Sequence, residues 1–106
     1  MHLGSVQLLL QTGTREALTS YADAVLGPLD AHRARGRSDL TTSLRAFLEA
    51  DGMVELAAAA LRVHRHTVRS RLRLLEEITS RRLDSVDDRA ELWLALRARD
   101  IAATLD

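Results

Sequence analysis

Apolar residues recur along much of the chain at intervals of three and four positions, the spacing that gathers them on one face of an α-helix. No stretch alternates apolar and polar residues as a half-buried strand would. The pattern therefore predicts an all-α fold. Its first long helix begins after Thr14, a residue suited to capping a helix N-terminus, and Gly27 and Pro28 are expected to end it. The buried face of that helix would hold Leu18, Tyr21, Ala22, Val25 and Leu26.

About five to six helices are predicted in all, the last of them a long C-terminal helix. Apart from the first long one, they are expected over residues 5–11, 39–51, 54–61, 64–79 and 86–103. Ser38 or Asp39 would cap the second of these helices, and Ser85 with Asp88 resembles the capping box that begins a helix. A chain of 106 residues is large enough for one hydrophobic core but not for two, so residues 1–106 are expected to form a single domain.

The last predicted helix is apolar on more than one side. Leu92, Leu96 and Ala103 form one stripe, and further apolar residues lie roughly opposite it. Because a helix with two apolar faces must bury both, we expect the second face to pair with another subunit or with a domain missing from this chain. The residues assigned to a homodimer interface are Trp93, Leu94, Ala98, Ile101 and Leu105.

Charge is distributed unevenly along the chain. The formal net charge is zero, with 15 basic residues, all of them arginine, and 15 acidic residues. Between residues 62 and 73, however, there are five arginines, two histidines and no acid. Binding to DNA would therefore rest on this local cluster and not on the charge of the whole protein. The chain has no cysteine and no apolar stretch long enough to span a membrane, so we expect a cytoplasmic protein.

Residues 54–79 are predicted to form a helix-turn-helix, in which a short alanine-rich helix precedes the charged one. At 100° per residue, Val68, Leu72 and Leu75 share the inner side of the charged helix, and its opposite side is basic and polar. A helix that is basic in its first two turns suits insertion of its N-terminal half into a major groove, where arginine pairs with guanine. The groove-facing residues are expected to be Arg65, His66, Thr67, Arg69, Ser70 and Arg73. Nearer the phosphates we expect Arg62, His64 and Arg71.

The run LAAAALRVHRHTVRSRLRLLEEIT, followed by LDSVDDRAELWLALRARDIA, resembles the C-terminal helix-turn-helix domain of PucR/CdaR-type bacterial transcriptional regulators. Its two-helix unit is also similar in layout to the Fis-type helix-turn-helix. The resemblance implies a domain that binds double-stranded DNA with its second helix, and an effector-sensing region that is missing from this chain. The most specific matching residues are Leu61, Val63, His64, Arg65, Thr67, Val68, Arg69, Arg71 and Leu72.

The chain departs from the family pattern at three informative positions. Met53 stands where the family usually has an asparagine, which removes a good cap from the first helix of the helix-turn-helix. His66 and Ser70 stand where the family often has asparagine and tyrosine. Both lie on the predicted outward face, so they change which bases are read and not whether DNA is bound.

Other interpretations are weaker. For Arg71, a phosphate contact and an ion pair with Glu55 or Asp88 are equal alternatives. His64 and His66 would point about 160° apart on a helix, which argues against a shared metal and favours His64 as a helix cap or phosphate contact. No nucleophile lies beside a base and no glycine-rich phosphate loop is present, so neither an enzyme nor a cofactor is expected. The rival function is a helical oligomerisation or protein-interaction module without direct DNA contact, suggested by the doubly apolar last helix.

Overall fold

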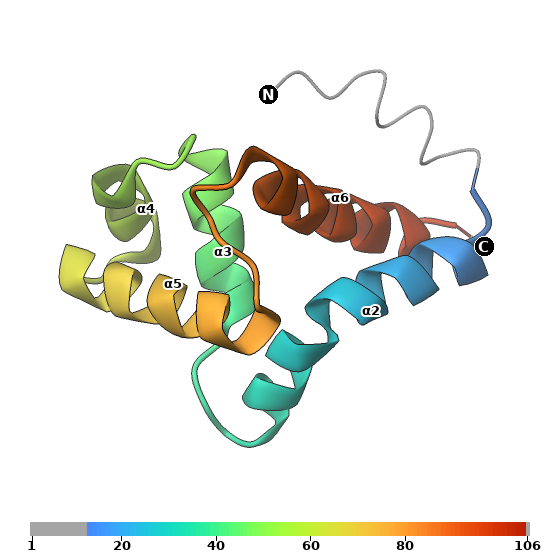
Figure 1. The fold of residues 1–106 in the computed structure, drawn as a ribbon, viewed down its shortest axis with the longest axis horizontal. Helices are drawn as coiled ribbons and strands as arrows, with labels where there is room; N and C mark the ends of the chain where they lie inside the picture. Colours follow the sequence, from blue (N-terminus) through green and yellow to red (C-terminus); the bar gives the residue numbers. More distant parts are fainter. Residues whose placement is uncertain (1–12, 106) are drawn as a thin grey trace.

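The computed structural model describes residues 13–105, which fold into five α-helices with no strand among them (Figure 1). In chain order these are α2 (Arg15–Ala34), α3 (Leu40–Glu49), α4 (Val54–Leu61), α5 (Arg65–Thr79) and α6 (Val86–Ala102). The predicted all-α fold is confirmed. The short helix predicted over residues 5–11 lies outside the described residues.

Three helices begin where the sequence predicts a cap. Thr14, Asp39 and Ser85 each accept a hydrogen bond through a side-chain oxygen from the backbone N–H three residues later, at 3.1, 3.1 and 3.2 Å. Such a bond satisfies one of the N–H groups left unpaired at a helix start. α4 differs, because Met53 is its N-cap and makes no side-chain bond. The position of α4 therefore depends on packing and not on a cap.

α2 continues through Gly27 and Pro28, so the prediction that it ends there is wrong. A proline inside a helix lacks the N–H that would bond one turn back, and it costs about 3 kcal/mol. Burial offsets that cost, because Leu29 lies inside the core directly after the proline, and burying a leucine side chain stabilises by about 1.5–3 kcal/mol. Asp30 then adds an ion pair with Arg99 of α6 at 2.8 Å. Tertiary contacts thus override the local stop signal.

α2 and α6 lie side by side and run in opposite directions along one flank of the domain (Figure 1). The buried cluster between them consists of Leu18, Ala22, Ala98, Ile101 and Ala102. Its alanines are small enough to let the two backbones approach closely. Arg99 fastens the pair, with its Nη2 atom 2.9 Å from Asp23 and 2.8 Å from Asp30.

This packing corrects the predicted dimer interface. Ala98 and Ile101 are buried under α2, so their surface is not available to a second subunit. Leu105 also packs partly against the same cluster. α6 does bury a second apolar face, but the partner of that face is α2 of the same chain.

The main core lies where α2, α3, α4, α5 and α6 meet. Leu44 from α3, Ala57 from α4, Val68 and Leu75 from α5, and Leu92 from α6 are all fully buried in it. The alanine of α4 lets that short helix lie close to its neighbours, so α5 is held from behind by packed side chains on its inner side. None of the described helices is long and apolar enough to cross a membrane.

Candidate nucleic-acid interface

The turn between α4 and α5 sets the angle at which the charged helix leaves its neighbour. Arg62 ends α4 in the left-handed region, at φ 58° and ψ 43°, a conformation that costs a non-glycine residue about 1–2 kcal/mol. The backbone N–H of Val63 donates to the carbonyl of Ala58 at 3.1 Å and closes the turn. The side chain of Arg62 is exposed directly before α5 begins.

His64 is the N-cap of α5. Its Nδ1 atom accepts a hydrogen bond from the backbone N–H of His66 at 3.1 Å, and the two rings stack with centroids 4.8 Å apart and planes inclined by 19°. The prediction that these side chains point about 160° apart is wrong, because His64 precedes the helix and helical spacing does not apply to it. The predicted capping role of His64 is confirmed. Within the described part of the chain, no group of three His, Cys, Asp or Glu side chains could hold a metal ion.

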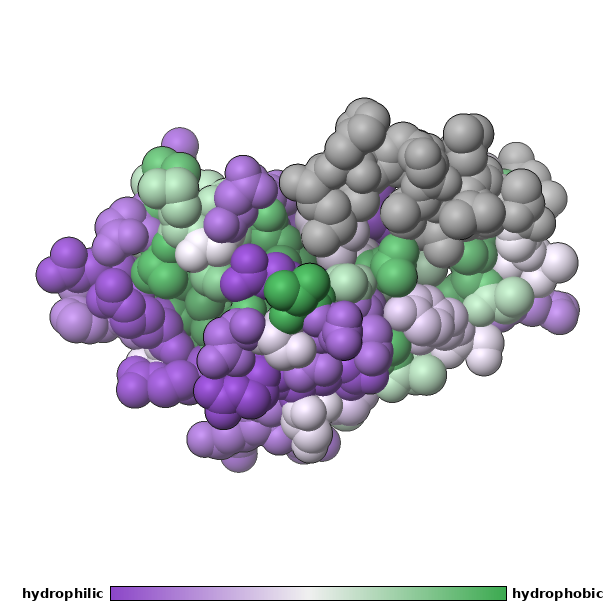
Figure 2. Space-filling model, turned by 45° about the horizontal axis from the view of Figure 1, so that its top comes forward, coloured by the Kyte–Doolittle hydropathy of each residue, from purple (hydrophilic) through white to green (hydrophobic). Residues whose placement is uncertain are grey.

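α5 separates an inner apolar side from an outer basic side. Val68, Leu72 and Leu75 are buried, as predicted. The predicted DNA-contacting residues that stay exposed are Arg62, His64, Arg65, His66, Arg69, Ser70 and Arg73. Thr67 and Arg71 are half-buried. Figure 2 shows hydrophilic side chains gathered at the left end of the molecule, where α5 begins. The outer side of the charged helix is therefore open to solvent.

The two acids considered as partners of Arg71 have other partners. Glu55 of α4 lies 3.6 Å from the Nη2 atom of Arg69, and Asp88 accepts a hydrogen bond from the backbone N–H of Arg82 at 2.8 Å. Arg71 forms no ion pair within residues 13–105. The pair between Arg69 and Glu55 is largely exposed and contributes about 0–1 kcal/mol, so it does not prevent Arg69 from turning toward a ligand.

The loop at residues 80–85 is fastened to both helices that flank it. The backbone N–H of Leu83 donates to Glu76 of α5 at 2.8 Å, and the Leu83 side chain is buried. Arg89 of α6 donates to the carbonyl of Leu83 through Nε at 3.0 Å and Nη2 at 2.6 Å, and its guanidinium lies 5.7 Å from the centre of the Phe47 ring. The loop therefore has a defined place beside α5.

A hollow of about 510 Å³ lies between α5, this loop and the turn from α3 to α4. The charged residues that line it are Arg69, Arg73, Arg82, Arg89, Glu76 and Asp84. Arg82 and Arg89 were not among the predicted site residues. The signal for Arg82 is a pair of arginines at positions 81 and 82, directly after the helix that carries the basic cluster.

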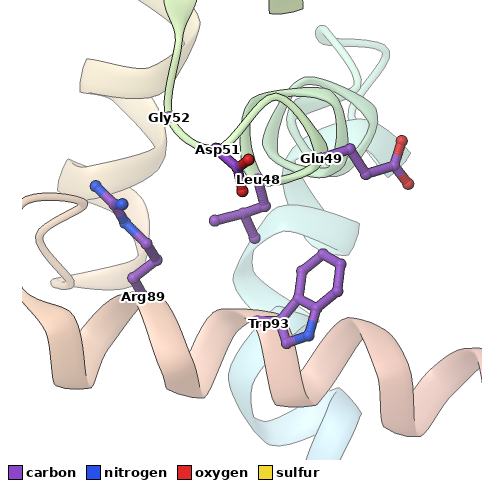
Figure 3. Close-up of a pocket in the computed structure, with 6 residues that line it drawn as sticks. All are labelled: Leu48, Glu49, Asp51, Gly52, Arg89 and Trp93. Atoms are coloured by element: carbon purple, nitrogen blue, oxygen red, sulfur yellow. The ribbon is translucent and has the colours of Figure 1, made fainter. Parts of the chain in front are cut away.

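A second hollow, of about 440 Å³, contains Trp93 (Figure 3). The Trp93 ring extends from α6 toward Leu48 of α3, and Glu49 and Asp51 line the same hollow. Two carboxylates against a single arginine, Arg89, make this hollow unsuited to phosphate. Trp93 and Leu94 are only half-buried, and they are the part of the predicted dimer interface that lies outside the cluster between α2 and α6.

A short helix and a tight turn that present the outer side of a second, basic helix define a helix-turn-helix domain. Residues 40–98 match the PucR C-terminal helix-turn-helix domain, and the chain belongs to this family. The predicted resemblance is confirmed. The chain is thus the DNA-binding output domain of a regulator.

Two relatives show how the chain compares with longer proteins. It is 36% identical over 97 residues to the "Transcriptional activator PmfR" of Paenarthrobacter nicotinovorans, a match that covers 88% of this chain and 20% of the activator. It is 34% identical over 91 residues to an uncharacterised protein in the pkwA 5′ region of Thermomonospora curvata, covering 86% of this chain and 48% of that protein. The chain therefore spans less than half the length of either relative. No solved structure gives a significant match.

Proposed function

We propose that this chain binds a specific sequence of double-stranded DNA as the output domain of a bacterial transcriptional regulator in the cytoplasm. The observation that carries the proposal is the outer side of α5, where arginines are exposed while the inner side is fixed in the core. A helix held in this way can place its N-terminal half in a major groove, where arginine forms paired hydrogen bonds with guanine. The relative named as a transcriptional activator supports this proposal.

The nine predicted DNA-contacting residues fall into two groups, base-contacting and phosphate-contacting, according to their place around α5. Ser70 lies near the middle of the outer side, and its small side chain permits the helix to approach the floor of the groove closely. We expect base contacts from Arg65, His66, Thr67, Arg69, Ser70 and Arg73. We expect phosphate contacts from Arg62, His64 and Arg71, which lie in the turn or on the flank of the helix.

A salt titration of duplex binding tests the proposal. The duplex would be selected from a random pool, and its affinity is expected to fall steeply with salt because bound arginines release counterions. Arg69→Ala or Arg73→Ala should each weaken binding by about 1–3 kcal/mol and relax the sequence preference. Arg37→Ala, an exposed arginine between α2 and α3, is the matched control. Equal effects of all three substitutions, or no preference for the selected duplex, would contradict the proposal.

The rival function, an interaction module without DNA contact, loses its main support in the structure. It was suggested by the two apolar faces of α6, and α2 covers the second of these within the same chain. It also gives no account of an exposed arginine cluster on α5. The DNA-binding proposal accounts for this cluster.

We also propose that two copies bind one operator. One helix reads only a few base pairs, and two half-sites about 10 bp apart would roughly double the contact. The second copy would dock at Trp93 and Leu94, which are half-buried, and not at the covered Ala98. Sedimentation at the concentrations used for DNA binding measures the mass, and Trp93→Ala should shift a dimer toward the monomer. A monomeric mass of the unchanged protein on the duplex would refute this.

The effector-sensing region implied by the family resemblance would belong to the part of the whole protein outside this chain. The chain covers only 20% of the activator that it matches, which leaves most of that protein to other tasks. We therefore assign the DNA-binding step to this chain and effector sensing to the remainder. An effector should accordingly leave the affinity of the isolated chain for its duplex unchanged.

A further inference from the structure

The hollow beside α5 carries an excess of positive charge. Four arginines line it against two acids. One of those acids, Glu76, accepts a hydrogen bond from the backbone N–H of Leu83. Arg89 donates two hydrogen bonds to the carbonyl of Leu83. Arg73 forms no ion pair within residues 13–105, and Arg82 pairs only with an exposed acid. These two arginines also both line a neighbouring hollow of about 390 Å³ at the end of α5. Among the four arginines of this hollow, Arg82 is thus the one that is neither assigned to a base contact nor bonded to the main chain, and it is available to an anion.

The backbone at Arg82 is fixed although its side chain is exposed. Its N–H donates to Asp88 of α6 at 2.8 Å, and the next residue, Leu83, is buried in the core. The Arg82 side chain itself is 72% exposed. Figure 1 shows the loop that carries it, running from the end of α5 to the start of α6. The fold therefore presents this guanidinium beside α5 without any rearrangement of the main chain.

We propose that Arg82 binds a phosphate of the DNA backbone at the edge of the groove that α5 enters, beside the base-contacting Arg73. The loop after the recognition helix would then be a second DNA-contacting element. This inference rests on the proposed function of α5. The chemistry fits, because a guanidinium presents paired N–H donors that match the oxygens of a phosphate, and its single positive charge neutralises that of a backbone phosphate.

Asp84 takes the place of that phosphate in the free protein. Its two carboxylate oxygens accept hydrogen bonds from Nε and Nη2 of Arg82 at 3.1 and 3.2 Å, which is the paired geometry that a phosphate would meet. These hydrogen bonds from Arg82 hold the pKa of Asp84 below its ordinary value. Both side chains are largely exposed, and a pair of that kind is weak enough to be exchanged for a bound phosphate.

Substitution of Arg82 tests the proposal in one direction. Arg82→Gln in the full chain should weaken binding about three- to tenfold, equally for the selected duplex and for an unrelated one, because a phosphate contact carries no sequence information. The slope of log affinity against log salt should fall by about one. Arg37→Gln, an exposed arginine in the loop before α3, should change neither quantity. Circular dichroism and urea unfolding confirm that each variant is folded.

Substitution of Asp84 tests it in the opposite direction. Asp84→Asn removes the acid that competes for Arg82, and the affinity for both duplexes should rise by up to about fivefold. A gain in affinity cannot be produced by misfolding. The double variant Arg82→Gln with Asp84→Asn should lose this gain, since no guanidinium remains at the loop to be released.

The outcomes separate this inference from the function on which it rests. If Arg69→Ala and Arg73→Ala weaken binding but Arg82→Gln behaves like Arg37→Gln, the second contact is refuted and the DNA-binding proposal stands. If Arg82→Gln affects only the selected duplex, the residue reads bases and the phosphate assignment is wrong. If none of these variants differs from the unchanged chain, the proposed function itself fails.

Discussion

Ile101→Ala separates two explanations for the apolar character of α6. If Ile101 belonged to an interface between two copies, its truncation would weaken dimerisation and the effect would depend on protein concentration. The structure instead buries Ile101 under α2, with 6% of its surface exposed. Truncation should therefore destabilise the single folded chain.

The expected magnitude follows from this burial. Replacing isoleucine by alanine removes three carbon atoms, each worth about 0.8 kcal/mol when transferred from water. The cavity left between α2 and α6 adds to this value, which places the total loss at about 2–5 kcal/mol. A domain of this size is stable by only about 5–15 kcal/mol, so a large share of its stability would be lost. Its melting temperature should fall by roughly 10–20 °C.

Urea unfolding followed by circular dichroism measures this loss. Val86→Ala, at an α6 position that is 83% exposed, is the matched control and should change the unfolding free energy by less than about 0.5 kcal/mol. The Ile101→Ala loss should be the same at every protein concentration. A loss no larger than that of Val86→Ala, or one that disappears as protein concentration rises, would refute the assignment of Ile101 to the core of a single chain.

Two further predictions concern backbone strain and pH. Arg62→Gly and Ser80→Gly should each raise the unfolding free energy by up to about 1 kcal/mol, because both residues have positive φ, at 58° and 56°, which glycine adopts without strain. In a duplex titration only Arg62→Gly should weaken binding, through loss of a phosphate contact. Burial acts to raise the pKa of Asp39, but hydrogen bonds from Thr42 outweigh it and hold the pKa below its ordinary value. This contribution to stability is present above the ordinary pKa and is lost as pH falls through the folded pKa. Asp39→Asn, which can still cap α3, should therefore lose less stability on acidification in urea unfolding at a series of pH values.

Features that depend on near neighbours along the chain were predictable from the sequence. The caps Thr14, Asp39 and Ser85 mark three helix starts because a capping side chain acts on a backbone group only three residues away. Val68 and Leu72 were correctly placed on the inner side of α5, since helical spacing alone decides which residues share a face. His64 is the local exception, because a residue at a helix cap does not follow that spacing.

Features that depend on distant residues were not predictable in this way. Pro28 carries a strong local stop signal, and the contacts that override it come from the core and from Arg99, far along the chain. The second face of α6 was known to need a partner, but nothing in the residues around Ile101 identifies α2 as that partner. Arg82 lies beside α5 because its neighbour Leu83 is held there. The Leu83 side chain is buried, and the backbone N–H of Leu83 donates a hydrogen bond to Glu76. Each miss therefore traces to a tertiary contact that has no local signal.

A net charge of zero is compatible with a cationic α5 because the acids are paired mainly elsewhere. The ion pairs away from that helix include those of Arg45 with Asp100, Arg81 with Glu91, and Arg99 with both Asp23 and Asp30. Within residues 13–105, the cluster at positions 62–73 forms one ion pair, between Arg69 and Glu55. Attraction between exposed charges fades within about 8–10 Å at ordinary salt, so a duplex that meets another face is not drawn to the cluster. The cluster on α5 attracts a duplex when α5 faces the DNA. We therefore expect nonspecific encounters that last to have the orientation that sequence-specific binding requires.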